Sequence, residues 1–481
     1  MNGHNDVEKM IMKANSAESV NPSQSSEKLS LVTKISYGLG DVGGQMVWNL
    51  SSSYLVLFYT DSVGLAAAAV GTLMFVARIT DAVFDPIWGA FTERRHTKYG
   101  RFRPWMIWGG PPLAIFTVLT FSTIPGTEGV KLAWAIVTYM IQGLLYSVVN
   151  LPYGALATVM TRDSGDRVAL SSYRMVGTNF GSIILGAITM PIVLMLSGGG
   201  DVATTGGFTA TAALFSIASL PLFALVFFTS KEVVQPVPEE TRVSLLSTFK
   251  TVLGNKPLML ITAMLICTMT SQFGRLGVAM YYIIYSLGRV DLAGWIMPIP
   301  PLFTIIGIAA FTRFAKRLGK KKMVMISILS SSGSLLLLFF AGPSNLVVVI
   351  LLSMLYGLGL FATPIVLAMV PDAIDYQEDR TGVRSDGTSY AMTSLAIKVA
   401  SALGGAIGAW CLAAFGYSAD AALSERTLTG INVAVNLMPA AILLLGLIPL
   451  AAYPITEAKY QAIRARLEAK MSPTGKSADD E

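Results

Sequence analysis

The sequence predicts an all-α membrane protein with about twelve transmembrane helices in two halves of six. Composition is the first reason. Hydrophobic residues make up 53% of the 481 residues and charged residues only 13%, whereas an ordinary soluble domain has about 25% charged residues. The mean hydropathy is +0.60. Most of the chain is therefore expected to lie in lipid.

The spacing of the apolar runs is the second reason. Runs of roughly 20 apolar residues are broken by polar connections, and in lipid each run must satisfy its own backbone hydrogen bonds as a helix. The expected spans begin near residues 37, 65, 103, 130, 169, 207, 258, 291, 322, 345, 387 and 429. An even number of spans returns the chain to the side on which it started.

Basic residues give the orientation. Lys and Arg collect in alternate connections, at 93–103, 161–167, 231–256, 313–322 and 378–384, whereas the opposite connections contain little more than Lys131, Arg289 and Arg426. The positive-inside rule then places both termini in the cytoplasm.

The longest interior polar stretch divides the spans into two sets. We expect a disordered cytoplasmic tail over 1–35, a first six-helix half over 36–229, a cytoplasmic linker over 230–257, a second half over 258–455 and a cytoplasmic tail over 456–481. Each half has a basic, glycine-containing turn after its second helix, YGRFR in one and LGKKK in the other. Such equivalent turns are expected if the chain is a transporter that arose by duplication of a six-helix unit.

Other classes of protein fit less well. His4 and His96 both lie in polar segments, so neither His-centred catalysis nor a zinc site is expected, and we predict no enzyme, no catalytic residues and no cofactor. The formal charge of +6 lies in short clusters between apolar spans, which does not suit nucleic-acid binding. A receptor more often has seven spans, whereas about twelve are expected here. A channel is expected to show a filter-like loop, and the sequence shows none.

The stretch RITDAVFDP places charge inside the second span. Arg78, Asp81 and Asp85 have i, i+3, i+7 spacing and share one helical stripe. A charge at the bilayer centre costs about 2.5–3.5 kcal/mol, so the stripe is expected to face inward. Arg78 neutralising one aspartate is the structural alternative, but it leaves the second carboxylate unexplained. Two carboxylates one turn apart either hold Na⁺, in which case they are the metal ligands, or share a proton.

Further polar side chains lie inside the other spans. They are Asp41, Gln45, Trp48 and Asn49 in the first, Gln142, Tyr146, Ser147 and Asn150 in the fourth, Arg174 and Asn179 in the fifth, and Lys398 in the eleventh. Contacts between helices explain Gln142 and Asn179 best. Arg174 and Lys398 either pair with Asp81 and Asp85 or receive an anionic or hydroxyl-rich substrate.

Several ordered motifs carry a family resemblance. SYGLGDVGGQ, FYTDSVGL, GTLMFVARITDAVFDPIWG, KYGRFRPW, YSVVNLPYGALATVMTRDSGDRVALSSYR and VPDAIDYQEDRTGVRSDGTSYA resemble the glycoside–pentoside–hexuronide:cation symporters, a branch of the major facilitator fold. The similarity covers nearly all of residues 36–460. It implies a multi-pass protein of the bacterial inner membrane whose partners are the lipid bilayer, a sugar and a monovalent cation, with a monomer as the functional unit.

The resemblance also implies roles for particular residues. Asp81 and Asp85 match the family's cation site, with Ser147 at the position of a hydroxyl ligand. Arg174 and Lys398 match residues that line the sugar and cation cavity. The full set expected at the substrate is Asp41, Gln45, Tyr146, Asn150, Arg174, Lys398 and Thr363.

Departures from the melibiose branch shift the expected substrate and ion. Gln45 and Asn150 replace two aspartates, and Gly154 and Thr363 stand where that branch has tryptophans. Losing two carboxylates while keeping Arg174 and Lys398 favours a uronide or related glycoside, although carriers of neutral pentosides also use an asparagine at position 150. Phe84 replaces an asparagine near the cation and favours H⁺ over Na⁺ as the coupling ion.

The expected function is therefore cation-coupled import of a glycoside by alternating access, with an uncoupled facilitator, a sugar sensor or a carrier of neutral pentosides or galactosides as alternatives. Charged cytoplasmic segments are expected either to lock the outward-facing state or to set the topology alone. The cytoplasmic residues concerned are Arg101, Arg103, Asp372, Asp375 and Arg384, with Glu378 and Asp379 in the same acidic patch, and Arg78 of the second span is assigned to the same charge network.

Overall fold

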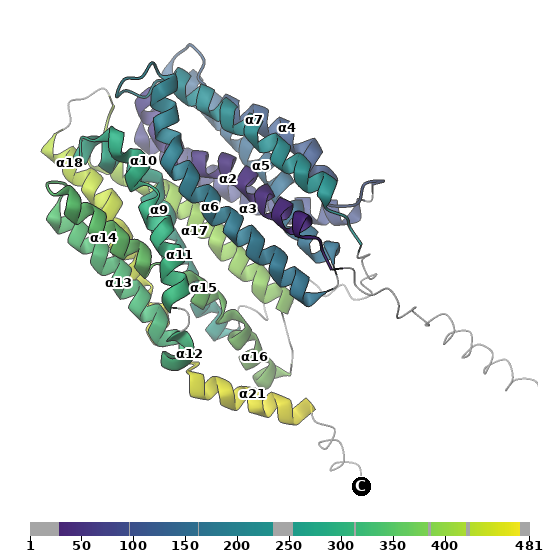
Figure 1. Cartoon of the computed structure of the whole chain (residues 1–481). Helices are drawn as coiled ribbons and strands as arrows, with labels where there is room; N and C mark the ends of the chain where they lie inside the picture. The colour runs from purple at the N-terminus through teal and green to yellow at the C-terminus, as the bar shows by residue number, and fades with distance from the viewer. Residues whose placement is uncertain are drawn as a thin grey trace, which may run out of the picture.

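The computed structural model describes residues 28–95, 97–161, 163–233, 254–311, 314–382, 386–419 and 424–471. Within these ranges almost all of the chain is helical, and the β-structure is confined to an isolated bridge between Thr97 and Gly100. The all-α prediction is confirmed (Figure 1).

The first half contains the helices α2 to α7. Their bounds are α2 Leu31–Leu57, continued by the π-helical turn η1 Phe58–Ser62, then α3 Ala67–Arg94, α4 Pro104–Thr120, α5 Glu128–Met160, α6 Ser164–Leu196 and α7 Thr205–Thr229. Side-chain caps start three of them, because Ser30, Asp163 and Thr204 accept hydrogen bonds from backbone N–H groups of α2, α6 and α7. α2 begins before residue 36, so 31–35 is helical although it was expected to belong to a disordered tail.

The second half is more often interrupted. It contains α9 Lys256–Tyr281 with η2 Tyr282–Ser286, η3 Val290–Leu292, α10 Ala293–Ile296, α11 Ile299–Phe311, α12 Ala315–Leu318, α13 Lys320–Ala341, α14 Leu346–Gly359, α15 Ala362–Leu367, α16 Val370–Thr381, α17 Asp386–Ala414, α18 Glu425–Asn432, η5 Val433–Leu437, α19 Met438–Leu445 and α20 Leu447–Ala452; α21 Glu457–Met471 follows. Residues 234–253, most of the expected linker, lie outside the described residues.

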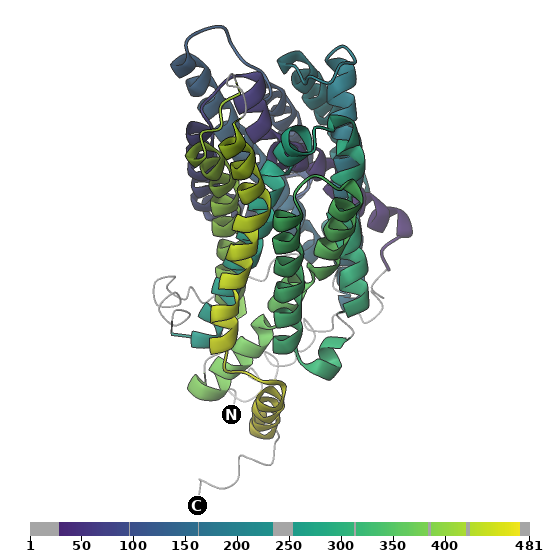
Figure 2. The same cartoon turned by 90° about the vertical axis from the view of Figure 1, so that its left-hand side faces the viewer.

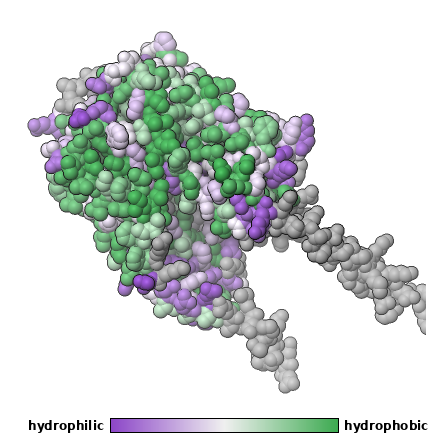
Figure 3. All heavy atoms as spheres, in the orientation of Figure 1, coloured by the Kyte–Doolittle hydropathy of each residue, from purple (hydrophilic) through white to green (hydrophobic). Residues whose placement is uncertain are grey.

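Ten of the described helical segments are long and apolar enough to cross a membrane by length and composition. α2, continued by η1, and the shorter α4 run alongside them and complete the expected set of about twelve (Figures 1 and 2). Apolar residues cover much of the side of the bundle that Figure 3 shows, whereas hydrophilic residues gather near its ends. The protein is therefore a multi-pass membrane protein.

The two halves meet more closely at one end than at the other. We call the end that carries residues 28 and 471 the tail end, and the end that carries η1 and η2 the far end. α2 packs on α6, α7 and α9, and α17 packs on both α9 and α3. From these contacts the halves spread apart toward the tail end (Figure 1).

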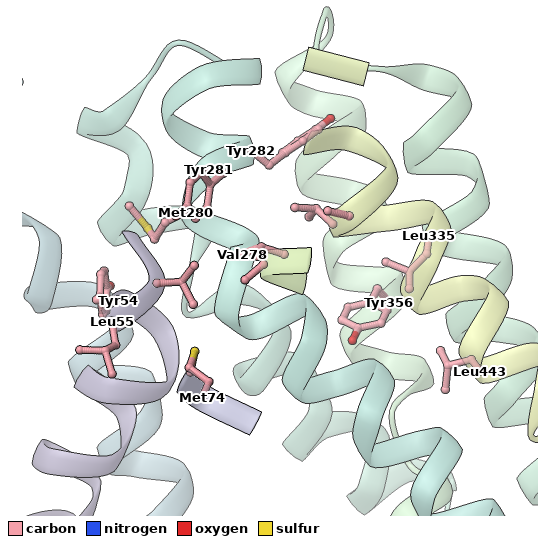
Figure 4. Close-up of a cluster of buried hydrophobic side chains, with 14 of the residues drawn as sticks. Tyr54, Leu55, Met74, Val278, Met280, Tyr281, Tyr282, Leu335, Tyr356 and Leu443 are labelled. Carbon is pink, nitrogen blue, oxygen red and sulfur yellow. The ribbon is translucent and has the colours of Figure 1, made fainter. Parts of the chain in front are cut away.

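The core surrounds α9. In Figure 4, Tyr54 and Leu55 of α2, Met74 of α3 and Met280 of α9 lie to one side of Val278, with Leu335, Tyr356 and Leu443 on the other side. Small residues permit the closest crossings. A Cβ atom on Gly177 of α6 would lie 2.1 Å from the carbonyl oxygen of Gly38 on α2. α9 is thus in contact with both halves.

Candidate functional site

The two aspartates of α3 are buried and each has a cation beside it. Arg78 Nη1 lies 3.4 Å from Asp81 Oδ2, and the Lys398 ammonium of α17 donates to Asp85 Oδ2. Lys398 belongs to the second half, so this ion pair joins the two halves. The other oxygens, Asp81 Oδ1 and Asp85 Oδ1, are buried and have no hydrogen-bond partner in the described part of the chain.

α5 forms the opposite wall of this site. A Cβ atom on Gly143 would lie 2.7 Å from Asp81 Oδ1, so only glycine lets that carboxylate approach the helix so closely. Ser147 is buried one turn further along α5. Since α3 and α5 both run from the far end to the tail end, this turn places Ser147 near the level of Asp85. Asp81 therefore lies against α5, and helical periodicity puts Ser147 on the face of α5 that Gly143 presents to it.

Aromatic rings fix Arg78. Its guanidinium carbon lies 4.0 Å from the centroid of the Trp48 ring on α2, and Trp48 in turn lies 5.3 Å from the Tyr146 ring on α5. The predicted substrate residue Tyr146 thus lies beside the α3 site. The Phe84 ring stacks on Trp88 of its own helix, with centroids 5.8 Å apart.

Arg174 belongs to a separate cluster between α2 and α6. Its Nε lies 3.2 Å from Asp41 Oδ1, and the Thr178 hydroxyl donates to Asp41 Oδ2. The guanidinium also lies over the Tyr153 ring, 5.0 Å from its centroid. Gly154 faces the same guanidinium, because a Cβ atom at position 154 would lie 3.1 Å from Arg174 Nη1. Arg174 pairs with Asp41 and not with the aspartates of α3.

The remaining predicted substrate residues are dispersed. Gln45 of α2 packs against Gly181 of α6, and Asn150 is half-buried on α5, one turn beyond Tyr146. Thr363 lies in α15 of the second half, where Gln272 Nε2 donates to its hydroxyl at 3.5 Å. Gln142 donates to Ser51 at 2.9 Å, as expected of a residue that joins two helices.

A cavity of about 290 Å³ lies between the halves. It is lined from the first half by α2 and α6, through residues such as Asn49 and Asn179, and from the second half mainly by α9, α11 and α14. The residues predicted to bind substrate are not among those that line it. Its charged residue is Arg275, which the sequence-based prediction missed. Arg275 stands in the apolar run TSQFGRLGVAM and meets the same criterion that singled out Arg174.

Hydrogen bonds join the two halves at the far end. The carboxylate of Asp61 in η1 accepts from the hydroxyls of Tyr417, at 2.7 Å, and Tyr285. The Thr60 and Tyr281 hydroxyls lie 2.6 Å apart. Asp61 lies in FYTDSVGL, a motif that the sequence had already supplied without assigning the aspartate a role.

At the tail end, the described contacts of the predicted gating residues stay within one half. Glu232 accepts from the backbone N–H groups of Arg101 and Arg103, at 2.8 and 2.9 Å. In the second half, Lys320 pairs with Asp372 at 2.7 Å. The other contacts described there join Asp375 to Tyr460 and Asp379 to Arg466. Arg384 lies outside the described residues.

The spans of the described chain form two halves with buried ion pairs and a cavity between them, which is the architecture of a membrane transporter. The chain belongs to the MFS/sugar transport protein family, which it matches over residues 36–457. The predicted family resemblance is confirmed.

Relatives match along most of the chain. It is 31% identical to the putative glycoside/cation symporter YagG of Escherichia coli, covering 94% of this chain and 98% of that protein. It is 30% identical to the isoprimeverose transporter of Lactiplantibacillus pentosus, covering 93% of each. It is 29% identical to the glucuronide carrier protein homolog of Escherichia coli, covering 92% and 96%.

A solved structure shows the same fold. The xylose transporter XylE from E. coli, in a partially occluded inward-open conformation, superposes with a TM-score of 0.56 at 14% identity, covering 89% of this chain and 98% of that one. The prediction of a major facilitator fold is confirmed.

Proposed function

We propose that this protein imports a glycoside together with a cation by alternating access. The observation that carries the proposal is the ion pair between Asp85 of the first half and Lys398 of the second. A carboxylate that a mobile partner half neutralises is a natural place for an ion to control the contact between halves. The unpartnered oxygens Asp81 Oδ1 and Asp85 Oδ1 offer that ion two ligand atoms.

Coupling then follows from competition. A cation bound at Asp81 and Asp85 competes with the Lys398 ammonium for Asp85, so ion binding changes the free energy of the contact between the halves. A sugar that binds between the halves responds to the same equilibrium, and linkage makes the effect reciprocal.

We propose H⁺ as the coupling ion and Na⁺ as the alternative. Na⁺ requires several oxygen ligands, and the described residues here offer two carboxylates and the Ser147 hydroxyl. A proton needs only one carboxylate oxygen, and Phe84 supplies no oxygen.

The proposed substrate is a glycoside with an acidic group, such as a uronide. The relative named as a glucuronide carrier supports this class. The relative named as an isoprimeverose transporter supports a neutral glycoside as the second candidate. We place the protein in a bacterial inner membrane with the tail end in the cytoplasm, since the basic segments 97–103 and 320–322 lie at that end. A monomer is proposed as the functional unit.

Sugar uptake into membrane vesicles tests the proposal. At fixed membrane potential, a pH gradient imposed without Na⁺ is expected to drive accumulation, and Asp85→Asn is expected to reduce it about a hundredfold. Asp291→Asn, at an exposed far-end carboxylate, is the matched control. If uptake depends on Na⁺ at constant pH, the proposed coupling ion is Na⁺ and not H⁺. If neither gradient raises the internal sugar concentration of wild-type vesicles above the external one, the protein is an uncoupled facilitator.

A further inference from the structure

Within the described part of the chain, Arg275 is a charged side chain without a counterion. It lies roughly 28 Å along α9 from Lys256, at about 1.5 Å per residue, and so well inside the membrane-spanning part. Its guanidinium carbon lies 4.6 Å from the centroid of the Tyr356 ring. The described residues that line its cavity include no Asp or Glu. Such a cation is costly in a membrane unless an anion compensates it.

The other intramembrane cations of the described chain differ from Arg275. Arg78 faces Asp81, Arg174 faces Asp41, and Lys398 faces Asp85. These ion pairs supply their own neutralisation, which leaves less positive charge for an acidic substrate. Because Asp41 and Asp85 already neutralise Arg174 and Lys398, the charge of these two residues no longer argues that they bind an acidic substrate.

Unpartnered polar atoms surround the same cavity. Ser53, Arg275, Tyr282 and Asn436 all line the cavity, and each carries a buried polar atom that lacks a hydrogen-bond partner in the described part of the protein. These atoms are the Ser53 hydroxyl, Arg275 Nε, the Tyr282 hydroxyl and Asn436 Oδ1. Buried polar groups are normally hydrogen-bonded. Since the residues that carry these atoms all line one cavity, we expect the cavity to suit a polar ligand that bears hydroxyl groups and an acceptor for the guanidinium.

We propose that Arg275 binds the acidic group, a carboxylate or sulfonate, of an anionic glycoside. This inference rests on the proposed transport function and names the side chain that sets its substrate class. Guanidinium groups bind planar carboxylates edge-on through paired hydrogen bonds, and Tyr356 packs against a face of the Arg275 guanidinium. Ser53, Tyr282 and Asn436 then contact the sugar hydroxyls. The cavity of about 290 Å³ lies near the lower end of the ~300–1,000 Å³ typical of small-molecule sites.

A purely structural role for Arg275 makes a different prediction. If the guanidinium served only to pack on Tyr356, its replacement would affect acidic and neutral glycosides alike. Matched pairs of ligands separate the two roles. Para-nitrophenyl glucuronide and glucoside differ only in carrying a carboxylate or a hydroxymethyl group, and the corresponding galacturonide and galactoside form a second pair. Sulfoquinovoside against glucoside tests a sulfonate.

Binding to the purified full-length protein is measured by calorimetry. We expect the wild-type protein to prefer the acidic member of at least one pair by about tenfold or more. Arg275→Gln is expected to abolish that preference by weakening the acidic ligand, and Arg275→Lys to retain part of it. Arg289→Gln, at an exposed far-end arginine, is expected to leave it unchanged.

A second variant keeps the test decisive if Arg275→Gln does not fold. Asn436→Asp places a carboxylate in the same cavity and is expected to remove the acidic preference by supplying an internal counterion. The inference is overturned if the wild-type protein prefers no acidic ligand, or if the Arg275 and Asn436 variants preserve the preference or weaken both members equally.

Vesicle uptake keeps the two proposals distinguishable. Ion-driven accumulation of a neutral glycoside, without any acidic preference, would retain coupled transport and reject the role of Arg275. An acidic preference that depends on Arg275, without ion-driven accumulation of any sugar, would do the reverse.

Discussion

The α3 site and the Arg275 cavity both contain buried charge, but the protein balances only one of them. At α3, Asp81 and Asp85 are paired with Arg78 and Lys398. In the cavity, Arg275 packs on the Tyr356 ring, and the other described lining residues are uncharged. A site that is neutral by itself can exchange one cation for another, whereas an unbalanced arginine requires an anion. The local charge balance therefore separates an ion site from a substrate site.

The largest effect on stability is expected when the ion pair between Asp85 and Lys398 is broken. Asp85→Asn or Lys398→Gln alone leaves one buried charge unpaired, and we expect each to lower the free energy of unfolding by about 3–5 kcal/mol. The double variant removes both charges and is expected to be more stable than the sum of the single changes predicts. Denaturant unfolding of the purified proteins measures this coupling.

The exposed pair Arg289 and Asp291 is the control for that cycle. We expect no measurable coupling there, because water solvates both groups. Strictly additive effects at Asp85 and Lys398 would contradict a functional ion pair between the halves.

A smaller effect is expected from narrowing the α3 site without changing its charge. Gly143→Ala adds a Cβ atom 2.7 Å from Asp81 Oδ1, so Asp81 must move. We expect the ion concentration for half-maximal uptake to rise about tenfold, equivalent to about 1.4 kcal/mol, with the Arg275-dependent preference unchanged. Gly89→Ala on α3, where an added Cβ meets nothing within 4 Å, is the control. If Gly143→Ala does not change the ion concentration for half-maximal uptake, Gly143 is not part of the ion site.

The smallest effect is expected at Asp61, where neutral hydroxyls and not a cation satisfy the carboxylate. Asp61→Asn keeps one acceptor oxygen but loses the charge that strengthens the bonds from Tyr285 and Tyr417. We expect the halves to separate more often at the far end. Labelling of Ser286→Cys by an impermeant maleimide, with Cys267 and Cys411 replaced by alanine, should then rise a few-fold. Labelling at the original rate would show that these bonds do not hold the halves together.

Much of the fold followed from local properties of the chain. The expected spans near 65, 103 and 207 begin within two residues of α3, α4 and α7, because lipid requires an apolar run to form its own helix. Asp81 and Asp85 were likewise predictable as a pair, since 3.6 residues per turn places them on one face of the same helix. Arg275 met the same criterion of a charge in an apolar span and was available to sequence reasoning.

The pairing of these charges was decided by tertiary structure. Helical periodicity fixes which side chains share a face, but the rotation and tilt of each helix decide what that face meets. Arg174 meets Asp41 across the close crossing of α2 and α6, and Lys398 reaches Asp85 because α17 packs on α3. The sequence by itself determined where charge enters the membrane. Only the packing of helices distant in the chain decided which charges are neutralised and left Arg275 without a carboxylate partner among the described residues.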